Sequence, residues 1–115
     1  MIEKETALHN LGPGWHSLIE KVYAIQDELS FCDGISAIER KNGMMYVLFH
    51  RPPLTTEHQE FILSAIEYRL ERLTAKLCED CGQYGIRRTE LPITRSLCTI
   101  CYANRYSEMA DNNSD

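Results

Sequence analysis

CEDCGQYGIRRTELPITRSLCTIC, residues 78–101, contains two Cys-x-x-Cys pairs separated by sixteen residues. Each pair at this spacing bends back over one metal ion, and the residues between the pairs fit a small β-hairpin. We therefore predict that one structural Zn²⁺ ion is bound in a zinc ribbon over residues 78–106. Its ligands would be Cys78, Cys81, Cys98 and Cys101. Since four thiolates complete the coordination of zinc, this metal is not expected to be catalytic.

Three other uses of paired cysteines stay open on the sequence alone. Two disulfides suit a secreted chain, thioredoxin-like redox chemistry uses one Cys-x-x-Cys in a βαβ unit, and a rubredoxin-like site binds iron. Within the ribbon, strands are expected over residues 86–89 and 94–97, and Gly82 suits a tight knuckle because glycine tolerates an unusual φ. The fifth cysteine, Cys32, lies outside the pattern and is expected to be a small buried hydrophobic residue.

Apolar residues recur at helical spacing over residues 14–30, which predicts an amphipathic helix. They are Trp15, Leu18, Ile19, Val22, Ile25 and Leu29. A second such pattern follows a capping-box pair, Thr56 and Gln59, and predicts a long helix over residues 56–77. Its apolar positions are Ile62, Leu63, Ile66, Leu70, Leu73 and Leu77, and its acidic strip of Glu60, Glu67 and Glu71 is expected to face solvent.

Asn42-Gly43 separates two strand-like stretches within residues 35–50. Both central residues of a type I′ turn need a positive φ, which Asn and Gly tolerate best, so the pair predicts a β-hairpin. The expected cross-strand pairs are Ile38 with Val47 and Ser36 with Phe49. The side chains expected on the core face are Ile38, Met45, Val47 and Phe49.

These patterns predict an α+β fold with the order helix, β-hairpin, long helix and C-terminal four-cysteine zinc ribbon. An α-β-β-α domain would occupy residues 1–77, beginning with a loose arm over residues 1–11, and the ribbon would follow directly. Residues 107–115 are polar and are expected to form a disordered tail.

The composition is that of a globular protein of 115 residues with 25% charged residues and a net charge of -5. No basic-then-apolar leader and no membrane-length apolar run is present, so we expect a cytoplasmic protein without a membrane partner. If four thiolates bind one Zn²⁺, the net charge becomes -5 - 4 + 2 = -7. An acidic chain has no long-range attraction to nucleic acid, so such binding is expected to be weak and a protein partner is favoured.

Five basic side chains are candidates for the partner surface. They are Arg69, Arg72 and Lys76 of the long helix and Arg87 and Arg88 of the ribbon. Ordinary solubilising charge is the alternative interpretation. No nucleophile-base pair or open metal site is marked in the sequence, so we expect a protein that is not an enzyme.

Two resemblances add to this interpretation. GWHSLIEKV at 14–22, ERKNGMMYVLF at 39–49 and the two cysteine pairs follow, in order, the layout of a group of small uncharacterised bacterial and phage proteins. That group has a Gly-Trp helix, a strand pair, a long helix and a C-terminal Cys-x-x-Cys-Gly zinc ribbon, and the resemblance implies no activity.

The ribbon alone resembles the four-cysteine zinc finger of the DksA/TraR family, which acts on RNA polymerase through its secondary channel. The matching residues are Cys78, Cys81, Gly82, Arg88, Pro92, Cys98 and Cys101. This resemblance implies four zinc ligands and a transcription modulator. The chain departs from that family because no helical arm with an acidic tip is evident, and Tyr102 replaces the usual Gln.

The leading hypothesis is a small zinc-ribbon protein that binds, and regulates or inhibits, a protein partner. A phage-type inhibitor of a host nucleic-acid-handling complex would fit the acidic charge. The alternatives are a DksA/TraR-like modulator of RNA polymerase and a nucleic-acid-binding zinc ribbon. The sequence does not name the partner or the oligomeric state.

Overall fold

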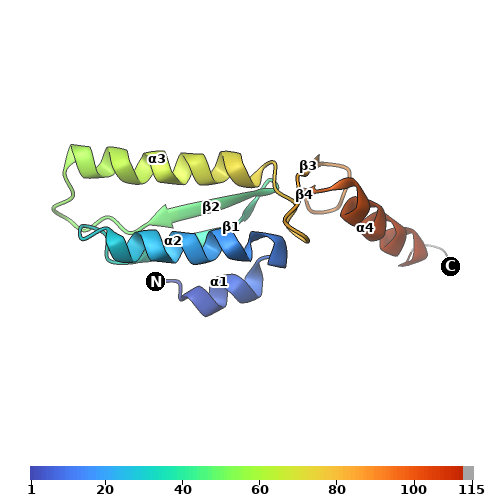
Figure 1. Ribbon diagram of the computed structural model, residues 1–115, viewed down its shortest axis with the longest axis horizontal. Helices are drawn as coiled ribbons and strands as arrows, with labels where there is room; N and C mark the ends of the chain where they lie inside the picture. The colour runs from blue at the N-terminus through green and yellow to red at the C-terminus, as the bar shows by residue number, and fades with distance from the viewer. Residues whose placement is uncertain (113–115) are drawn as a thin grey trace.

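The computed structural model describes residues 1–112 and has the α+β order that the sequence predicts (Figure 1). Its elements are α1 (Lys4–Asn10), the 3-10 turn η1 (Pro13–Trp15), α2 (His16–Glu28), β1 (Ile35–Lys41), β2 (Met44–Phe49), α3 (Glu57–Thr74), β3 (Ile86–Arg88), β4 (Arg95–Leu97) and α4 (Thr99–Asn112). β1 pairs with β2, and β3 with β4, in two separate antiparallel sheets. The two short ribbon strands thus lie inside the predicted ranges.

The β1–β2 hairpin turns as predicted, with φ values of 55° at Asn42 and 78° at Gly43. Ile38 lies opposite Val47, which confirms the predicted register next to the turn. The predicted pairing of Ser36 with Phe49 is wrong, because a bulge between Ile35 and Ala37 places Ile35 opposite Phe49 instead. The bulge brings Ile35 into the core, where it is 1% exposed.

One apolar core joins the hairpin to α2 and α3, which run along it (Figure 1). Its largest fully buried side chains include Trp15 and Ile19 near the start of α2, Leu63 of α3, and Met45 and Phe49 of β2. All four predicted core-face residues of the hairpin are buried. The core therefore forms between one face of the sheet and the apolar stripes of two helices.

α3 also satisfies the outer edge of β2. The Thr74 hydroxyl accepts the Met45 N–H at 2.8 Å, and the Glu67 carboxylate accepts the Phe49 N–H at 2.8 Å. Both groups would otherwise be unpaired at the edge of a two-stranded sheet. Thr74 also donates to the Leu70 carbonyl at 2.7 Å and ends α3, three residues earlier than predicted.

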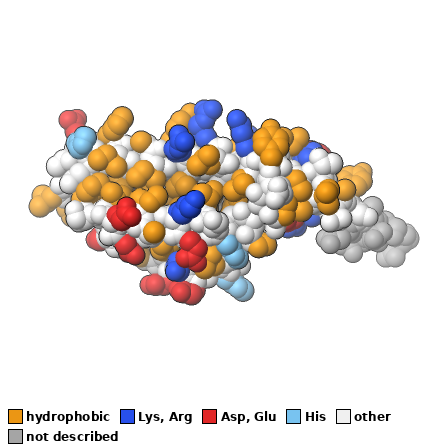
Figure 2. All heavy atoms as spheres, in the orientation of Figure 1, with side chains coloured by type: hydrophobic (Ala, Val, Ile, Leu, Met, Phe, Trp, Pro, Cys, Tyr) orange, Lys and Arg blue, Asp and Glu red, His pale blue; other side chains and the backbone are white. Residues whose placement is uncertain are grey.

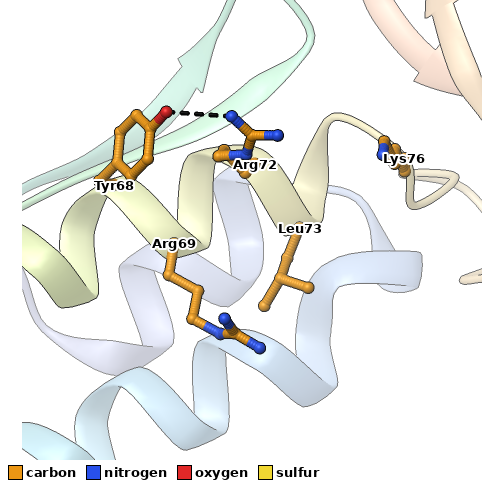
Figure 3. Close-up of a pocket in the computed structure, with 5 residues that line it drawn as sticks. All are labelled: Tyr68, Arg69, Arg72, Leu73 and Lys76. Atoms are coloured by element: carbon orange, nitrogen blue, oxygen red, sulfur yellow. Dashed lines mark hydrogen bonds between the residues drawn. The ribbon is translucent and has the colours of Figure 1, made fainter.

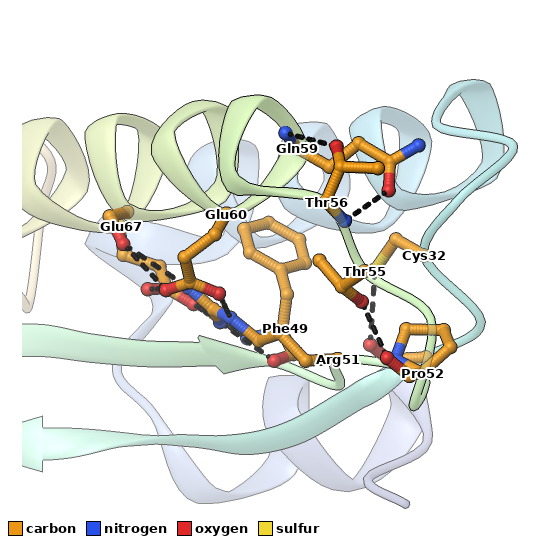
Figure 4. A network of polar contacts seen from close by, with 11 residues as sticks. Cys32, Phe49, Arg51, Pro52, Thr55, Thr56, Gln59, Glu60 and Glu67 are labelled. Carbon is orange, nitrogen blue, oxygen red and sulfur yellow. Dashed lines mark hydrogen bonds and ion pairs between the residues drawn. The ribbon is translucent and has the colours of Figure 1, made fainter.

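Figure 4 shows the polar network at the opposite end of α3, where the predicted capping box of Thr56 and Gln59 is formed. Arg51 bridges Glu60 and Glu67, and its hydrogen bond with Glu67 raises the pKa of the guanidinium above its ordinary value. The Glu67 side chain is only 15% exposed. The expectation of a solvated acidic strip is therefore wrong for Glu67, because this carboxylate both caps the sheet edge and binds Arg51.

The expected loose arm over residues 1–11 is also wrong. Residues 4–10 form α1, and Ala7 and Leu11 are buried in the main core. The Ile2 N–H donates to the Ile35 carbonyl at 2.9 Å, and the Tyr23 hydroxyl donates to the Ile2 carbonyl at 2.8 Å. The first residues are thus held to β1 by a backbone hydrogen bond and to α2 by the hydroxyl of Tyr23.

The end of the chain differs from the prediction as well. α4 extends through residues 99–112, so residues 107–112, which were expected to be disordered, continue a helix. The remainder of the predicted tail, residues 113–115, lies outside the described residues. The molecule is elongated, with extents of 58 × 23 × 20 Å, and the ribbon and α4 form one end of it (Figure 1). None of the described helices combines the length and apolar character needed to cross a bilayer.

The ribbon docks on the segment Gly12-Pro13-Gly14 before Trp15, which we call the glycine seat. The Gly14 N–H donates to the Glu79 carbonyl at 2.7 Å, and the Trp15 indole N–H donates to the Leu77 carbonyl at 2.9 Å. A Cβ on Gly14 would overlap the Cys78 carbonyl and the Gly82 amide, and one on Gly12 would overlap Glu79. Both positions need glycine because two backbones approach each other here.

We predict that Gly14→Ala separates the ribbon from its seat and lowers the free energy of unfolding by about 3 kcal/mol, because rigid backbone surrounds the added methyl group. Urea denaturation measures this change. Gly34→Ala is the matched control, since the three atoms nearest to its methyl group would all belong to the movable side chain of Met1. Equal stability of the two variants would contradict the proposed close approach.

Candidate metal centre

The four predicted ligands come together as expected. The thiol sulfurs of Cys78, Cys81, Cys98 and Cys101 all lie within 4.8 Å of one another. Cys78 is buried, Cys98 and Cys101 are half-buried, and Cys81 is exposed. The cluster thus lies at the surface of the ribbon, with Cys78 on its buried side and Cys81 on its exposed side.

The sulfur spacing suits a metal ion and not a disulfide. Cys81 Sγ and Cys98 Sγ are 3.6 Å apart. A tetrahedral ion with metal–sulfur bonds of about 2.3 Å holds its sulfurs about 3.8 Å apart, whereas a disulfide requires about 2.05 Å. All four thiols are free in the structure. These four cysteines are therefore arranged to hold a metal ion, and a four-coordinate site leaves no position for a substrate.

Each cysteine pair sits in a turn that prepares it for binding. Gly82 follows the first pair with φ 82°, which confirms the predicted knuckle, and its N–H donates to the Cys78 carbonyl at 2.9 Å. In the second pair, Cys98 directly precedes α4 and its sulfur accepts the Cys101 N–H at 3.4 Å. This hydrogen bond, followed by contacts with the other three thiols, lowers the pKa of the Cys98 thiol to about 7. A thiolate is the form that binds metal.

Glu79, between the first two ligands, points away from the metal cluster and into the protein. Its side chain has no exposure, and Arg40 of β1 binds both carboxylate oxygens. Arg95 of β4 lies 3.4 Å from the same carboxylate, and the Gly12 N–H donates to it at 3.1 Å. Burial and the nearby charge of Arg40 lower the pKa of Arg95. One buried acid therefore connects the metal knuckle to the hairpin, to the ribbon strand and to the glycine seat.

Asp80, the next residue, points to the other side. Its two carboxylate oxygens accept hydrogen bonds at 2.7 Å from the Nε and Nη2 of Arg105 in α4. This bidentate pair fixes α4 to the first knuckle. Within the first Cys-x-x-Cys, Glu79 thus binds the α/β part, residues 1–77, and Asp80 binds the C-terminal helix α4.

Sequence reasoning missed these acids and their partners. Glu79 and Asp80 were indistinguishable from surface charges, since nothing local says which side chain is buried. A clue did exist: Gly12-Pro13-Gly14 before a single tryptophan is typical of a close backbone approach. Cys32 is 6% exposed and stands outside the cluster, which agrees with the expectation of a buried hydrophobic residue.

The structure brings three of the five predicted partner-binding residues together. Arg69 and Arg72 of α3 and Lys76, just after the helix, line one shallow surface with Tyr68 and Leu73 (Figure 3). We call these five residues the α3 patch. The ribbon begins directly beside it, because the Gly85 N–H donates to the Lys76 carbonyl at 2.9 Å.

The two ribbon arginines behave differently from each other. Arg87 is exposed and pairs with Ser96, whose hydroxyl lies 3.0 Å from the Ala75 carbonyl at the end of α3. Paired residues point to the same face of a sheet, so Arg87 faces the junction with α3. Arg88 instead donates to the Leu97 carbonyl at 3.2 Å and lies over the Tyr102 ring. Arg88 therefore stabilises the ribbon against α4.

The fold and the site define an α+β chain with a C-terminal four-cysteine metal module. Comparisons with protein-family models, with curated proteins and with solved structures found no match. The module is docked to the rest of the chain by Glu79 and by the glycine seat.

We predict that purified protein contains one metal ion per chain and that Cys98→Ser loses it, because the variant leaves three thiolates for a four-coordinate site. Elemental analysis measures the ratio of metal to protein. Cys32→Ser should keep the full metal content, since this buried thiol is no part of the cluster. Full occupancy of Cys98→Ser would show that the ion binds elsewhere.

A second prediction concerns Glu79. Glu79→Gln preserves the shape of the side chain but leaves Arg40 and Arg95 without their carboxylate, and we expect a loss of about 3 kcal/mol in the free energy of unfolding. Urea denaturation of the metal-loaded protein measures it. Glu39→Gln, an exposed neutralisation on β1, is the control. Similar losses in the two variants would contradict the role given to the buried ion pair.

Proposed function

We propose that this chain is a small zinc-stabilised protein that binds a protein partner and regulates or inhibits it. Zinc is the ion best suited to four thiolates in a closed tetrahedral site. Elemental analysis of the unaltered protein is therefore expected to find zinc and not iron. The ion is structural in this proposal: it folds residues 78–101 and gives the ribbon a fixed surface.

The observation that carries the proposal is the exposure of large apolar side chains on and around the ribbon. A chain segment of about thirty residues presents five of them to solvent. They are Tyr84 at 72%, Ile86 at 47%, Ile93 at 56%, Ile100 at 74% and Tyr106 at 55% exposure. Several exposed large apolar side chains on one small module are typical of a protein-binding surface.

α4 adds to this surface because it extends away from the body of the molecule (Figure 1). A shallow groove along it is lined by Tyr102, Ala103 and Tyr106, together with Thr99 and Ser107. The Arg105–Asp80 ion pair fixes the helix in this position. Exposed aromatic residues on a fixed helix lose little conformational entropy when they bind, which favours their use as anchors.

Charge favours a protein over nucleic acid as the partner. From residue 78 to residue 105 the basic residues are Arg87, Arg88, Arg95 and Arg105 and the acidic residues are Glu79, Asp80 and Glu90, which gives 4 - 3 = +1. A zinc ion with four thiolates adds -2, so the loaded ribbon has a net charge of -1. Two of these arginines are already paired with carboxylates in the structure. Few cations therefore remain for phosphates.

We predict that the zinc-loaded chain captures a protein from an extract of its own host, and that Tyr84→Ala with Ile100→Ala reduces the capture about tenfold through loss of apolar contact. Quantitative mass spectrometry of the captured proteins measures this. Leu54→Ala with Phe61→Ala is the matched control, because these side chains are exposed at the opposite end of the molecule. The activity of the captured protein, assayed with and without the chain, then tests regulation.

Capture that is lost with the control pair and kept with the ribbon pair would contradict the proposed surface. Capture of nucleic acid alone, abolished by nuclease treatment, would contradict a protein partner. Polymerase subunits among the captured proteins would favour the transcription modulator, and a nuclease complex would favour the inhibitor.

A further inference from the structure

The α3 patch is a concentration of positive charge on an acidic chain. Three of its five residues are cations, and none of the described residues that line it is acidic. Figure 2 shows basic side chains grouped above the ribbon end of α3, with hydrophobic side chains on either side of them. The net charge of the whole chain is -5, so the patch has the opposite sign to the protein that bears it.

The cations of the patch are not neutralised within the molecule. Among the side chains that the structure describes, those of residues 1–107, no carboxylate lies within ion-pair distance of Arg69, Arg72 or Lys76. The contrast is with Arg40, Arg51, Arg95 and Arg105, each of which contacts an acid. The arginines that contact acids therefore serve the fold, whereas these three cations are open to another molecule.

Apolar surface accompanies the charge. Tyr68 is 59% exposed and Leu73 is 46% exposed, although the sequence predicted Leu73 for the buried stripe of α3. Leu73 shares a flank of α3 with Arg69, whereas the neighbouring Leu70 and Thr74 are the residues that are buried. Figure 3 shows Leu73 and Arg69 on one flank of α3 and Tyr68 with Arg72 on the other.

The guanidinium of Arg72 is oriented by its contact with Tyr68. Its Nη1 donates to the Tyr68 hydroxyl at 3.0 Å, and its guanidinium carbon lies 5.7 Å from the Tyr68 ring centroid. A guanidinium has five N–H donors, so this contact leaves most of them for a carboxylate. Because the side chain is already oriented, less conformational entropy is lost on binding.

We propose that the α3 patch binds an acidic peptide segment of the partner, with carboxylates on Arg69, Arg72 and Lys76 and an apolar side chain against Leu73 and Tyr68. This inference rests on the proposed function and gives the chemistry of the bound segment. Opposite charges attract the segment at long range, and the apolar contact adds affinity that salt does not screen. Tyr84 is also exposed, and it precedes Gly85, whose N–H donates to the Lys76 carbonyl.

A protein segment suits the patch better than a single-stranded nucleic acid. Arg72 lies over the Tyr68 ring, so that ring is less accessible to a base. Three cations neutralise few phosphates, and the acidic remainder of the chain repels a long polyanion. An acidic peptide is short enough to contact the patch alone.

The test begins with selection of random peptides on the immobilised, zinc-loaded full chain. The selected peptides are expected to combine Asp or Glu with a large apolar residue. Fluorescence anisotropy with labelled copies of these peptides should show binding that Arg69→Glu with Arg72→Glu weakens about tenfold, because the variant repels their carboxylates. Lys4→Glu with Lys41→Glu is the matched control, since it changes the net charge equally on α1 and β1 and should bind as the unaltered chain does.

Selected peptides without acidic residues, or peptides whose binding survives the Arg69 and Arg72 exchange, would overturn this inference and leave the proposed protein-binding function intact. A thymidine oligonucleotide that binds through Arg69 and Arg72 when no peptide is selected would overturn both. Sedimentation of the chain alone completes the test: a dimer that the same exchange dissociates would identify a second copy as the occupant and overturn the peptide proposal.

Discussion

The carboxylate of Glu79 has no contact with solvent, so its negative charge has to be balanced inside the protein. The balancing groups come from three distant parts of the chain: Arg40 on β1, Arg95 on β4 and the backbone of Gly12. If the ribbon were docked differently on residues 1–77, the charge of Glu79, Arg40 or Arg95 would lose its partner. This constraint specifies the docked position of the ribbon in which Glu79 meets Arg40, Arg95 and Gly12.

The metal cluster and the Glu79 contact depend on each other because Glu79 follows Cys78 directly. Binding of an ion would fix the first knuckle, and a fixed knuckle holds the Glu79 side chain toward Arg40. The backbone reinforces this geometry, since the Glu79 N–H donates to the Ser96 carbonyl and its own carbonyl accepts the Gly14 N–H. Metal binding and docking of the ribbon should therefore be energetically coupled, as is usual where metal affinity contributes to folding.

Some arginines of this molecule form ion pairs within the fold, whereas others are open to a partner. Arg51 joins the end of the hairpin to α3, Arg40 and Arg95 serve Glu79, and Arg105 holds α4. The proposals for partner binding therefore rest on the residues that remain near the ribbon end: the α3 patch and the exposed apolar side chains of the ribbon and α4. The α3 patch lies beside the start of the ribbon, so one partner could contact both surfaces.

The sequence by itself determined the elements whose cause is local. Asn42-Gly43 specified the hairpin turn because few other residue pairs accept two positive φ values, and the spacing of the four cysteines specified their cluster because each Cys-x-x-Cys is a self-contained turn. The capping box at Thr56 and the apolar stripes of α2 and α3 are local in the same sense. These features needed no knowledge of what lies across the core.

Only the tertiary structure decided what depends on distant neighbours. The polar beginning of the chain forms α1 because Ala7 and Leu11 pack in the core. The bulge at Ser36 places Ile35 in the core as well. Glu67 caps a sheet edge, and Glu79 is buried while the adjacent Asp80 reaches α4. A carboxylate has the same local pattern in each of these roles, because its burial is determined by the cation or amide that another part of the chain brings to it.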